Sequence, residues 1–241
     1  MNHRYLSRLP DPVRDVVVRI EAFADSEIQV EVDSRPVEPT DPNPDRLACE
    51  VTEHTATIWL RAADVFPTSA VIHELLHIQR YWNERIPQIM PTTDPTGANI
   101  VNTSAIENAL EHLIIVPRVE AFGFDPYPYW AETARENWST YPWPNMTSAW
   151  ARRKNCLLAW LTVTHLTKDP GLQAQVRLHL RNEGLLADAE AFSKKITRTL
   201  PSKMRALGTV VRFLRIPYDE VTGMLFDVQN RRRVEVTIPF Q

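Results

Sequence analysis

Two histidines and a glutamate between Pro67 and Trp82 have the spacing of a metal-binding motif. The segment His73-Glu74-Leu75-Leu76-His77 has the form H-E-x-x-H, in a stretch whose pattern predicts a helix. On a helix, His73 and His77 lie one turn apart and point the same way, so their imidazoles can bind one Zn²⁺ ion. Glu74 lies about 100° around the helix, where a general base can take a proton from a water molecule on the metal. The opposite face has the spacing of a buried stripe, formed by Val71, Leu75, Ile78 and Trp82.

The alternative is that both histidines are packed and hydrogen-bonded without a metal. The helical context, the buried stripe and the acidic helix that follows favour the metal site. That second helix is expected from Ser104 to Pro117, with Phe122 as the alternative end, and Glu107 and Glu111 share one of its faces.

The third metal ligand is expected on this second helix. Glu107 and Glu111, four residues apart on one face, are the first candidates. If Ser104 and Glu107 instead form a capping box, Glu111 becomes the ligand. His112, about 100° around the helix from Glu111, is a third candidate and ranks below both glutamates.

The strand, the motif helix and the acidic helix together resemble the zincin metallopeptidases over residues 54–118. They look most like the gluzincin branch, in which a glutamate on the next helix is the third zinc ligand. His73, Glu74 and His77 match that branch, whereas Glu107-Asn-Ala-Leu-Glu111 has the form E-x-x-x-E where E-x-x-x-D is common. The resemblance favours Glu107 as the third ligand, with Glu111 orienting one of the two motif histidines. It also implies a zinc peptidase in which Zn²⁺ polarises the scissile carbonyl. Glu74 would then activate water and pass the proton to the leaving amine.

Length and composition predict one globular zincin-like domain spanning residues 1–241, with its best internal seam near 125–144. The chain has 44% hydrophobic and 24% charged residues, which is ordinary for a globular protein. Its net charge of −3 and lack of a strongly basic domain give no indication of nucleic acid as a partner. Cys49 and Cys156 are too few and too far apart for a disulfide framework, and no signal peptide or membrane-spanning run is visible. A cytoplasmic location is therefore expected, with no membrane partner; the oligomeric state is not indicated.

The predicted fold class is α+β, mostly helical, with a small N-terminal antiparallel or mixed sheet and a C-terminal β-hairpin. Helices are expected at 11–24, at the motif (capped by Thr68 or Ser69), and at 104–117, 146–167, 171–182, 185–200 and 203–214. Strands are expected at 27–33, 47–51 and 56–60, and the hairpin at 224–228 and 234–238. The proline-rich stretch 86–103 is expected to be a loop.

The expected function is a soluble intracellular zinc peptidase acting on a peptide or protein, such as a specific regulatory protein. An extended substrate could pair with the strand at 55–60. The oxyanion could be stabilised by a side-chain donor, for which the candidates are Tyr127, Tyr129, Tyr141 and His165. Two other functions are compatible with the sequence: a non-catalytic zincin-like binding or sensor module, and a zinc hydrolase of a non-peptide amide.

Overall fold

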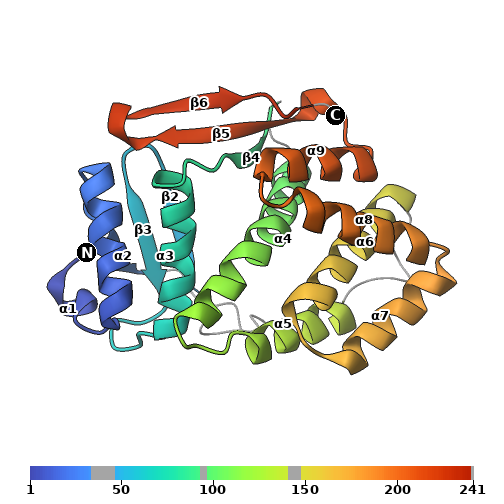
Figure 1. The fold of residues 1–241 in the computed structure, drawn as a ribbon, viewed down its shortest axis with the longest axis horizontal. Helices are drawn as coiled ribbons and strands as arrows, with labels where there is room; N and C mark the ends of the chain where they lie inside the picture. The colour runs from blue at the N-terminus through green and yellow to red at the C-terminus, as the bar shows by residue number, and fades with distance from the viewer. Residues whose placement is uncertain (34–46, 93–96, 141–147, 240–241) are drawn as a thin grey trace. The chain divides into compact units, whose positions relative to one another are not determined.

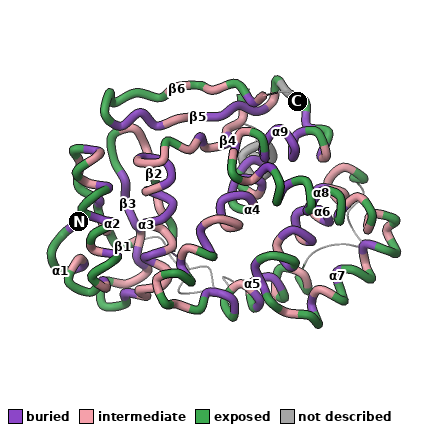
Figure 2. Tube along the Cα trace, in the orientation of Figure 1, coloured by how far each residue is buried: buried purple, intermediate pink, exposed green. Residues whose placement is uncertain are grey.

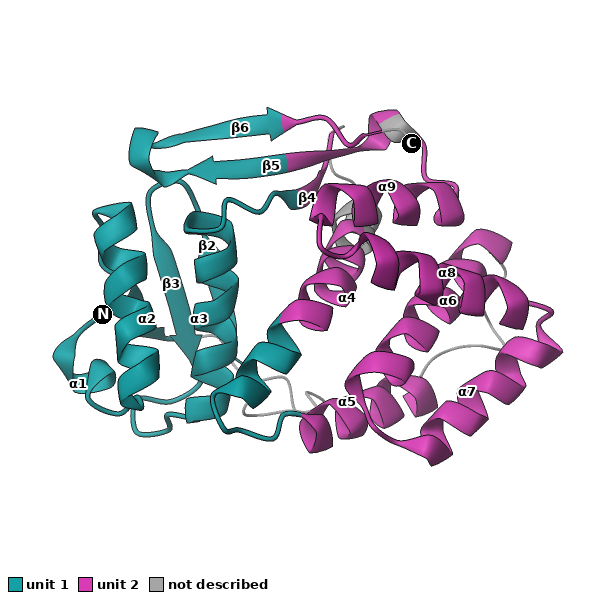
Figure 3. Ribbon diagram, in the orientation of Figure 1, with its two compact units in different colours: residues 1–88, 115–126, 224–235 teal, residues 89–114, 127–223, 236–241 magenta. Residues whose placement is uncertain are grey.

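The computed structural model describes residues 1–33, 47–92, 97–140 and 148–239, with α+β architecture and a predominance of helix (Figure 1). The chain divides into two compact units (Figure 3). Unit 1 comprises residues 1–88, 115–126 and 224–235, and unit 2 comprises residues 89–114, 127–223 and 236–241. One boundary, between residues 126 and 127, lies in the aromatic stretch 125–144.

A three-stranded mixed sheet organises unit 1. It contains β1 (Gln29–Val32), β2 (Ala48–Val51) and β3 (Ala56–Leu60) in the order β1-β3-β2. β1 runs parallel to β3, with Gln29 opposite Thr57, and β2 runs antiparallel to β3, with Cys49 opposite Ile58. The predicted mixed N-terminal sheet is therefore confirmed. Because β3 is paired on both sides, the expectation that it pairs with a substrate is wrong; among the described strands of this sheet, β1 and β2 are the edges.

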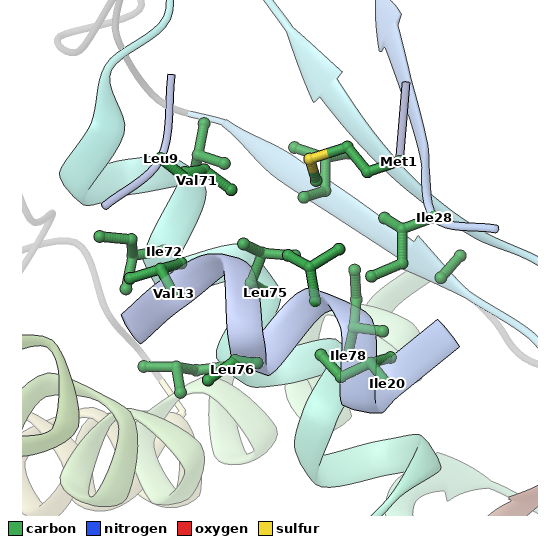
Figure 4. Close-up of a cluster of buried hydrophobic side chains, with 14 of the residues drawn as sticks. Met1, Leu9, Val13, Ile20, Ile28, Val71, Ile72, Leu75, Leu76 and Ile78 are labelled. Atoms are coloured by element: carbon green, nitrogen blue, oxygen red, sulfur yellow. The ribbon is translucent and has the colours of Figure 1, made fainter. Parts of the chain in front are cut away.

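Helices α2 (Asp11–Ala24) and α3 (Thr68–Trp82) form the core of unit 1 together with this sheet, and the short α1 (His3–Leu6) precedes them. Figure 4 shows the interlocking apolar side chains of the two long helices. The predicted buried stripe of α3 is confirmed, since Val71, Leu75, Ile78 and Trp82 are each at most 1% exposed. β3 and α3 are mostly buried (Figure 2). The predicted cap is wrong, because Pro67 occupies the N-cap position and no side chain caps the helix.

The stretch 86–103, predicted as a loop, instead contains strand β4 (Gln88–Pro91) and the start of helix α4 (Gly97–Ala121). Ser104 therefore lies two turns inside α4, so the proposed capping box with Glu107 does not exist. The helix also continues beyond Pro117. A proline removes the backbone bond to the Leu113 carbonyl. Burial of Ile115, Val116 and Val119 offsets this loss.

Unit 2 is mainly helical. Its helices are α5 (Tyr127–Thr140), α6 (Ala149–Leu166), α7 (Pro170–Asn182), α8 (Leu186–Thr199) and α9 (Lys203–Leu214). The last four agree with the sequence prediction to within a few residues, whereas α5 was not predicted. Their buried faces share one apolar core that includes Leu157, Leu161, Phe192 and Val210. The Asp169 carboxylate caps α7 by accepting a hydrogen bond from the Leu172 amide at 3.0 Å.

A second sheet has the order β4-β5-β6, with β5 (Val221–Asp227) and β6 (Arg232–Val236) forming the C-terminal hairpin. The short helices η2 (Tyr218–Glu220) and η3 (Val228–Asn230) precede β5 and connect it to β6. The predicted hairpin is confirmed, although both strands begin and end earlier than expected. None of the described helices has the length and hydrophobicity that a membrane crossing requires.

Candidate metal centre

Helix α3 places the two motif histidines side by side. The ring centroids of His73 and His77 are 5.0 Å apart, in an edge-to-face arrangement. His77 is 7% exposed and also stacks on Tyr81, with centroids 6.1 Å apart, whereas His73 is half-buried. Their four-residue spacing thus produces neighbouring imidazoles on one side of α3, and packing limits the orientation of the His77 ring.

Burial keeps the His73 imidazole neutral. Desolvation of the charged form lowers the pKa of His73 to about 4. At neutral pH this ring therefore has a nitrogen lone pair available, and the neutral imidazole is the form that binds a metal.

The C-terminal turns of α4 share the apolar core of unit 1 with α3. Ile115 and Val119 belong to the same apolar core as Val71 and Leu75. The guanidinium of Arg118 also makes a two-pronged ion pair with Glu84, just beyond the end of α3. Glu84 in addition accepts a hydrogen bond from Arg80 of α3 at 3.1 Å. Apolar packing and this ion-pair network together place α4 beside α3 one turn after His112.

His112 precedes Ile115 by three residues on α4. One potential ligand atom from each of His73, His77 and His112 can be chosen so that all three lie within 4.8 Å of one another. Zn–N bonds of about 2.0–2.1 Å in a tetrahedral site would require nitrogens about 3.3 Å apart. The upper limit of 4.8 Å on the separation of the three ligand atoms is compatible with such a site. Among the described residues, these three histidines form a group whose ligand atoms have the spacing of a metal site.

An aromatic side chain from α5 contacts His112. The ring centroids of His112 and Trp130 are 4.4 Å apart, and Tyr129 contacts Trp130 edge to face. Neither contact could have been found from the sequence, because α5 was not predicted and nothing in the chain relates residue 130 to residue 112.

The glutamates favoured as ligands from the sequence participate in a different cluster. Glu107 and Glu111 are 4% and 0% exposed, and both form ion pairs with the buried Lys203 of α9; the Lys203–Glu111 distance is 2.8 Å. Glu107 also accepts a hydrogen bond from the Ile89 amide at 3.0 Å. Two buried carboxylates thus share one ammonium group within unit 2, and neither belongs to the three-histidine group.

Glu74 of α3 is half-buried, and it interacts with Cys49 of strand β2. Burial, together with the charge of the Glu74 carboxylate and a hydrogen bond to it, raises the pKa of Cys49 well above the ordinary thiol value. The thiol is therefore protonated at neutral pH and can donate to Glu74. Sequence reasoning missed this contact, because only the pairing of β2 and the packing of α3 bring the two residues together.

The candidate oxyanion donors lie in varied surroundings. Tyr127 is buried beneath the Lys168 ammonium, 3.4 Å above its ring, and Tyr129 is 39% exposed. His165 Nε2 is 2.9 Å from the Ser193 hydroxyl, in a cavity formed by α6, α7 and α8. Tyr141 lies outside the described residues.

Comparisons with protein-family models, curated proteins and solved structures give no match to this chain. The functional argument therefore depends on the site itself.

Proposed function

We propose that the chain is a zinc-dependent metallopeptidase of zincin type, with His73, His77 and His112 as the metal ligands. The observation that carries this proposal is the grouping of three imidazoles within 4.8 Å, with Glu74 next to His73 on the same helix. Three histidine ligands with water in the fourth position form the donor set of a catalytic rather than a structural zinc site. His112 thus replaces Glu107 and Glu111 as the proposed third ligand.

A bound Zn²⁺ ion would activate water and polarise the carbonyl of the substrate. Glu74 is the general base: its carboxylate accepts the proton from the attacking water and then donates it to the leaving amine. The neutral Cys49 thiol, which can donate a hydrogen bond to Glu74, would hold the carboxylate in position while leaving its charge intact.

The proposed substrate is a peptide segment in extended form. Among the described strands, β2 lies at an edge of its sheet and pairs with β3. An extended main chain could add to the other side of β2 by backbone hydrogen bonds. Because Cys49 of β2 contacts Glu74, a peptide bound there would pass close to the proposed base.

The first test is metal content. The purified protein should bind about one zinc per chain, as measured by mass spectrometry of the metal. His73→Ala, His77→Ala and His112→Ala should each lose most of it, whereas His165→Ala, at a histidine outside the group, should retain it. Full zinc occupancy in the His73, His77 and His112 variants would overturn the metal site.

The second test separates catalysis from binding. Glu74→Gln preserves the size of the side chain but cannot accept the proton, so turnover of a cleaved peptide should fall by ~10²–10⁴-fold while zinc content stays at the wild-type level. Cleavage of a peptide library by the wild type identifies substrates for this measurement. Zinc binding with no cleavage of peptides would favour a non-catalytic module, and cleavage confined to small amides would favour the non-peptide hydrolase.

A further inference from the structure

The α8–α9 region has an unusual distribution of charge. Residues 191–218 contain seven lysines and arginines and no aspartate or glutamate. The whole chain has 27 basic and 30 acidic residues, so the remaining residues have 20 basic and 30 acidic. The overall charge of −3 therefore averages a basic segment at residues 191–218 with an acidic remainder.

Most of these cations are on the surface and lack an acidic partner. Lys203 is buried with Glu107 and Glu111, but Lys194, Lys195, Arg198, Arg205 and Arg212 are exposed. None of the five pairs with a carboxylate in the described part of the chain. We call these five residues the basic surface.

Two hollows next to α8 are lined by the basic surface. The larger, of about 480 Å³, contains Lys194 and Arg198 together with the hydroxyl groups of Ser193 and Thr197. The smaller, of about 100 Å³, contains Lys195, Arg205 and Arg212 together with the hydroxyl groups of Thr199 and Thr209. Lysine and arginine side chains contact phosphate oxygens in nucleic-acid complexes. The hydroxyl groups of Thr197, Thr199 and Thr209 already donate to backbone carbonyls, so the cations supply the donors.

The carboxylate in these hollows is already neutralised. Glu190 of the larger hollow pairs with Arg177 at 3.2 Å, and the Arg177 guanidinium covers the Trp160 ring at 5.3 Å from its centroid. The Trp160 indole is therefore covered and cannot stack on a nucleic-acid base. The large apolar side chains that are exposed in the described residues are not on α8 or α9. The basic surface thus has charge and hydrogen-bond donors, but no aromatic platform for unstacked bases.

We propose that the basic surface binds the phosphate backbone of a double-stranded nucleic acid. The argument is charge complementarity at two neighbouring hollows, with phosphate-type donors and no means of reading single-stranded bases. Binding through the backbone alone would be independent of nucleotide sequence. This site is separate from the proposed metal centre and does not depend on peptidase activity.

Fluorescence anisotropy with a labelled 20-base-pair DNA duplex tests this proposal. Contacts from five cations predict a slope of about −4.5 for log affinity against log salt concentration, so affinity should fall ~500-fold between 50 and 200 mM NaCl. In the triple variant Lys194→Gln, Lys195→Gln, Arg198→Gln, the slope should weaken to about −1.8, with a corresponding loss of affinity at 50 mM. Glutamine has good helix propensity and these positions are exposed, so the variant should fold normally, as checked by circular dichroism.

The matched control is the triple variant Arg8→Gln, Arg14→Gln, Arg19→Gln. It removes the same charge from unit 1, at two positions on α2 and one position just before it. Its affinity and salt slope should equal those of the wild type. Lack of binding at 50 mM NaCl, or an equal effect of both triple variants, would overturn the proposal. Tighter binding to polyglutamate or to vesicles with anionic headgroups than to the duplex would overturn it as well, because the surface would then serve another class of partner.

Discussion

Substitutions in the Lys203 cluster distinguish a structural role for Glu107 from a metal-binding role. Glu107→Gln removes one of the two carboxylates that share the Lys203 ammonium group. The amide oxygen of glutamine can still accept the hydrogen bond from Ile89, and Lys203 keeps Glu111 at 2.8 Å. The loss is therefore that of a hydrogen bond to a charged group, about 1.5–3 kcal/mol of unfolding free energy.

Lys203→Met should be more damaging than Glu107→Gln. It leaves two carboxylates, 4% and 0% exposed, without the ammonium that they share. Breaking a buried ion pair in this way costs about 3–5 kcal/mol. The triple variant Lys203→Met, Glu107→Gln, Glu111→Gln replaces the cluster by neutral groups and should recover much of that loss, because no uncompensated charge remains.

Urea unfolding followed by circular dichroism measures these free energies, and metal analysis of the same samples measures zinc. We expect Glu107→Gln and Glu111→Gln to lose stability and retain zinc. His112→Ala should lose zinc and keep most of the stability of the metal-free protein. If Glu107→Gln instead loses zinc while its metal-free form unfolds like the wild type, Glu107 is the ligand and the three-histidine site is wrong.

Three further predictions follow from contacts in the two units. Trp82 is fully buried and its indole Nε1 donates to the Thr52 carbonyl at 2.8 Å, so Trp82→Phe should lower the unfolding free energy by about 2–4 kcal/mol, measured by urea unfolding; a loss below about 0.5 kcal/mol would contradict this packing. Glu74→Gln removes the carboxylate that, after burial, raises the pKa of Cys49, so iodoacetamide should label native Cys49 faster in the variant than in the wild type; Cys156, whose pKa burial raises to about 12, is the internal control, and an unchanged Cys49 rate would argue against the contact. The pKa of Asp169 is lowered by the hydrogen bond from the Leu172 amide and by Arg135, so its contribution to stability is fully present above its unfolded pKa near 3.8 and is lost as the pH falls through the lower folded pKa. Asp169→Asn should therefore destabilise the protein relative to wild type at pH 6 but not at pH 2, and an equal difference at both pH values would refute this linkage.

Local patterns were sufficient for many of the elements. The apolar positions of α2 and α3 recur with the period of a helix, and they lie on the buried side of each helix. The four-residue spacing of His73 and His77 likewise predicted that the two rings are neighbours, because this arrangement follows from helix geometry alone. The predictions failed at the starts of two helices: α4 begins at Gly97, inside the stretch predicted as a loop, and α3 begins after Pro67 without a side-chain cap.

The partners of the motif were decided by tertiary structure. Glu107, Glu111 and His112 are three candidates on one helix, and the resemblance to the gluzincin branch ranked the glutamates first. The position of Lys203, more than ninety residues later, pairs both glutamates, while the packing of Ile115 and Val119 against α3 fixes the turns next to His112. The contact of Cys49 with Glu74 also depends on strand pairing across the sheet. Sequence spacing thus determines which side chains share one face of a helix. The residues that contact that face come from segments distant in the sequence, and no local pattern predicts which segments these are.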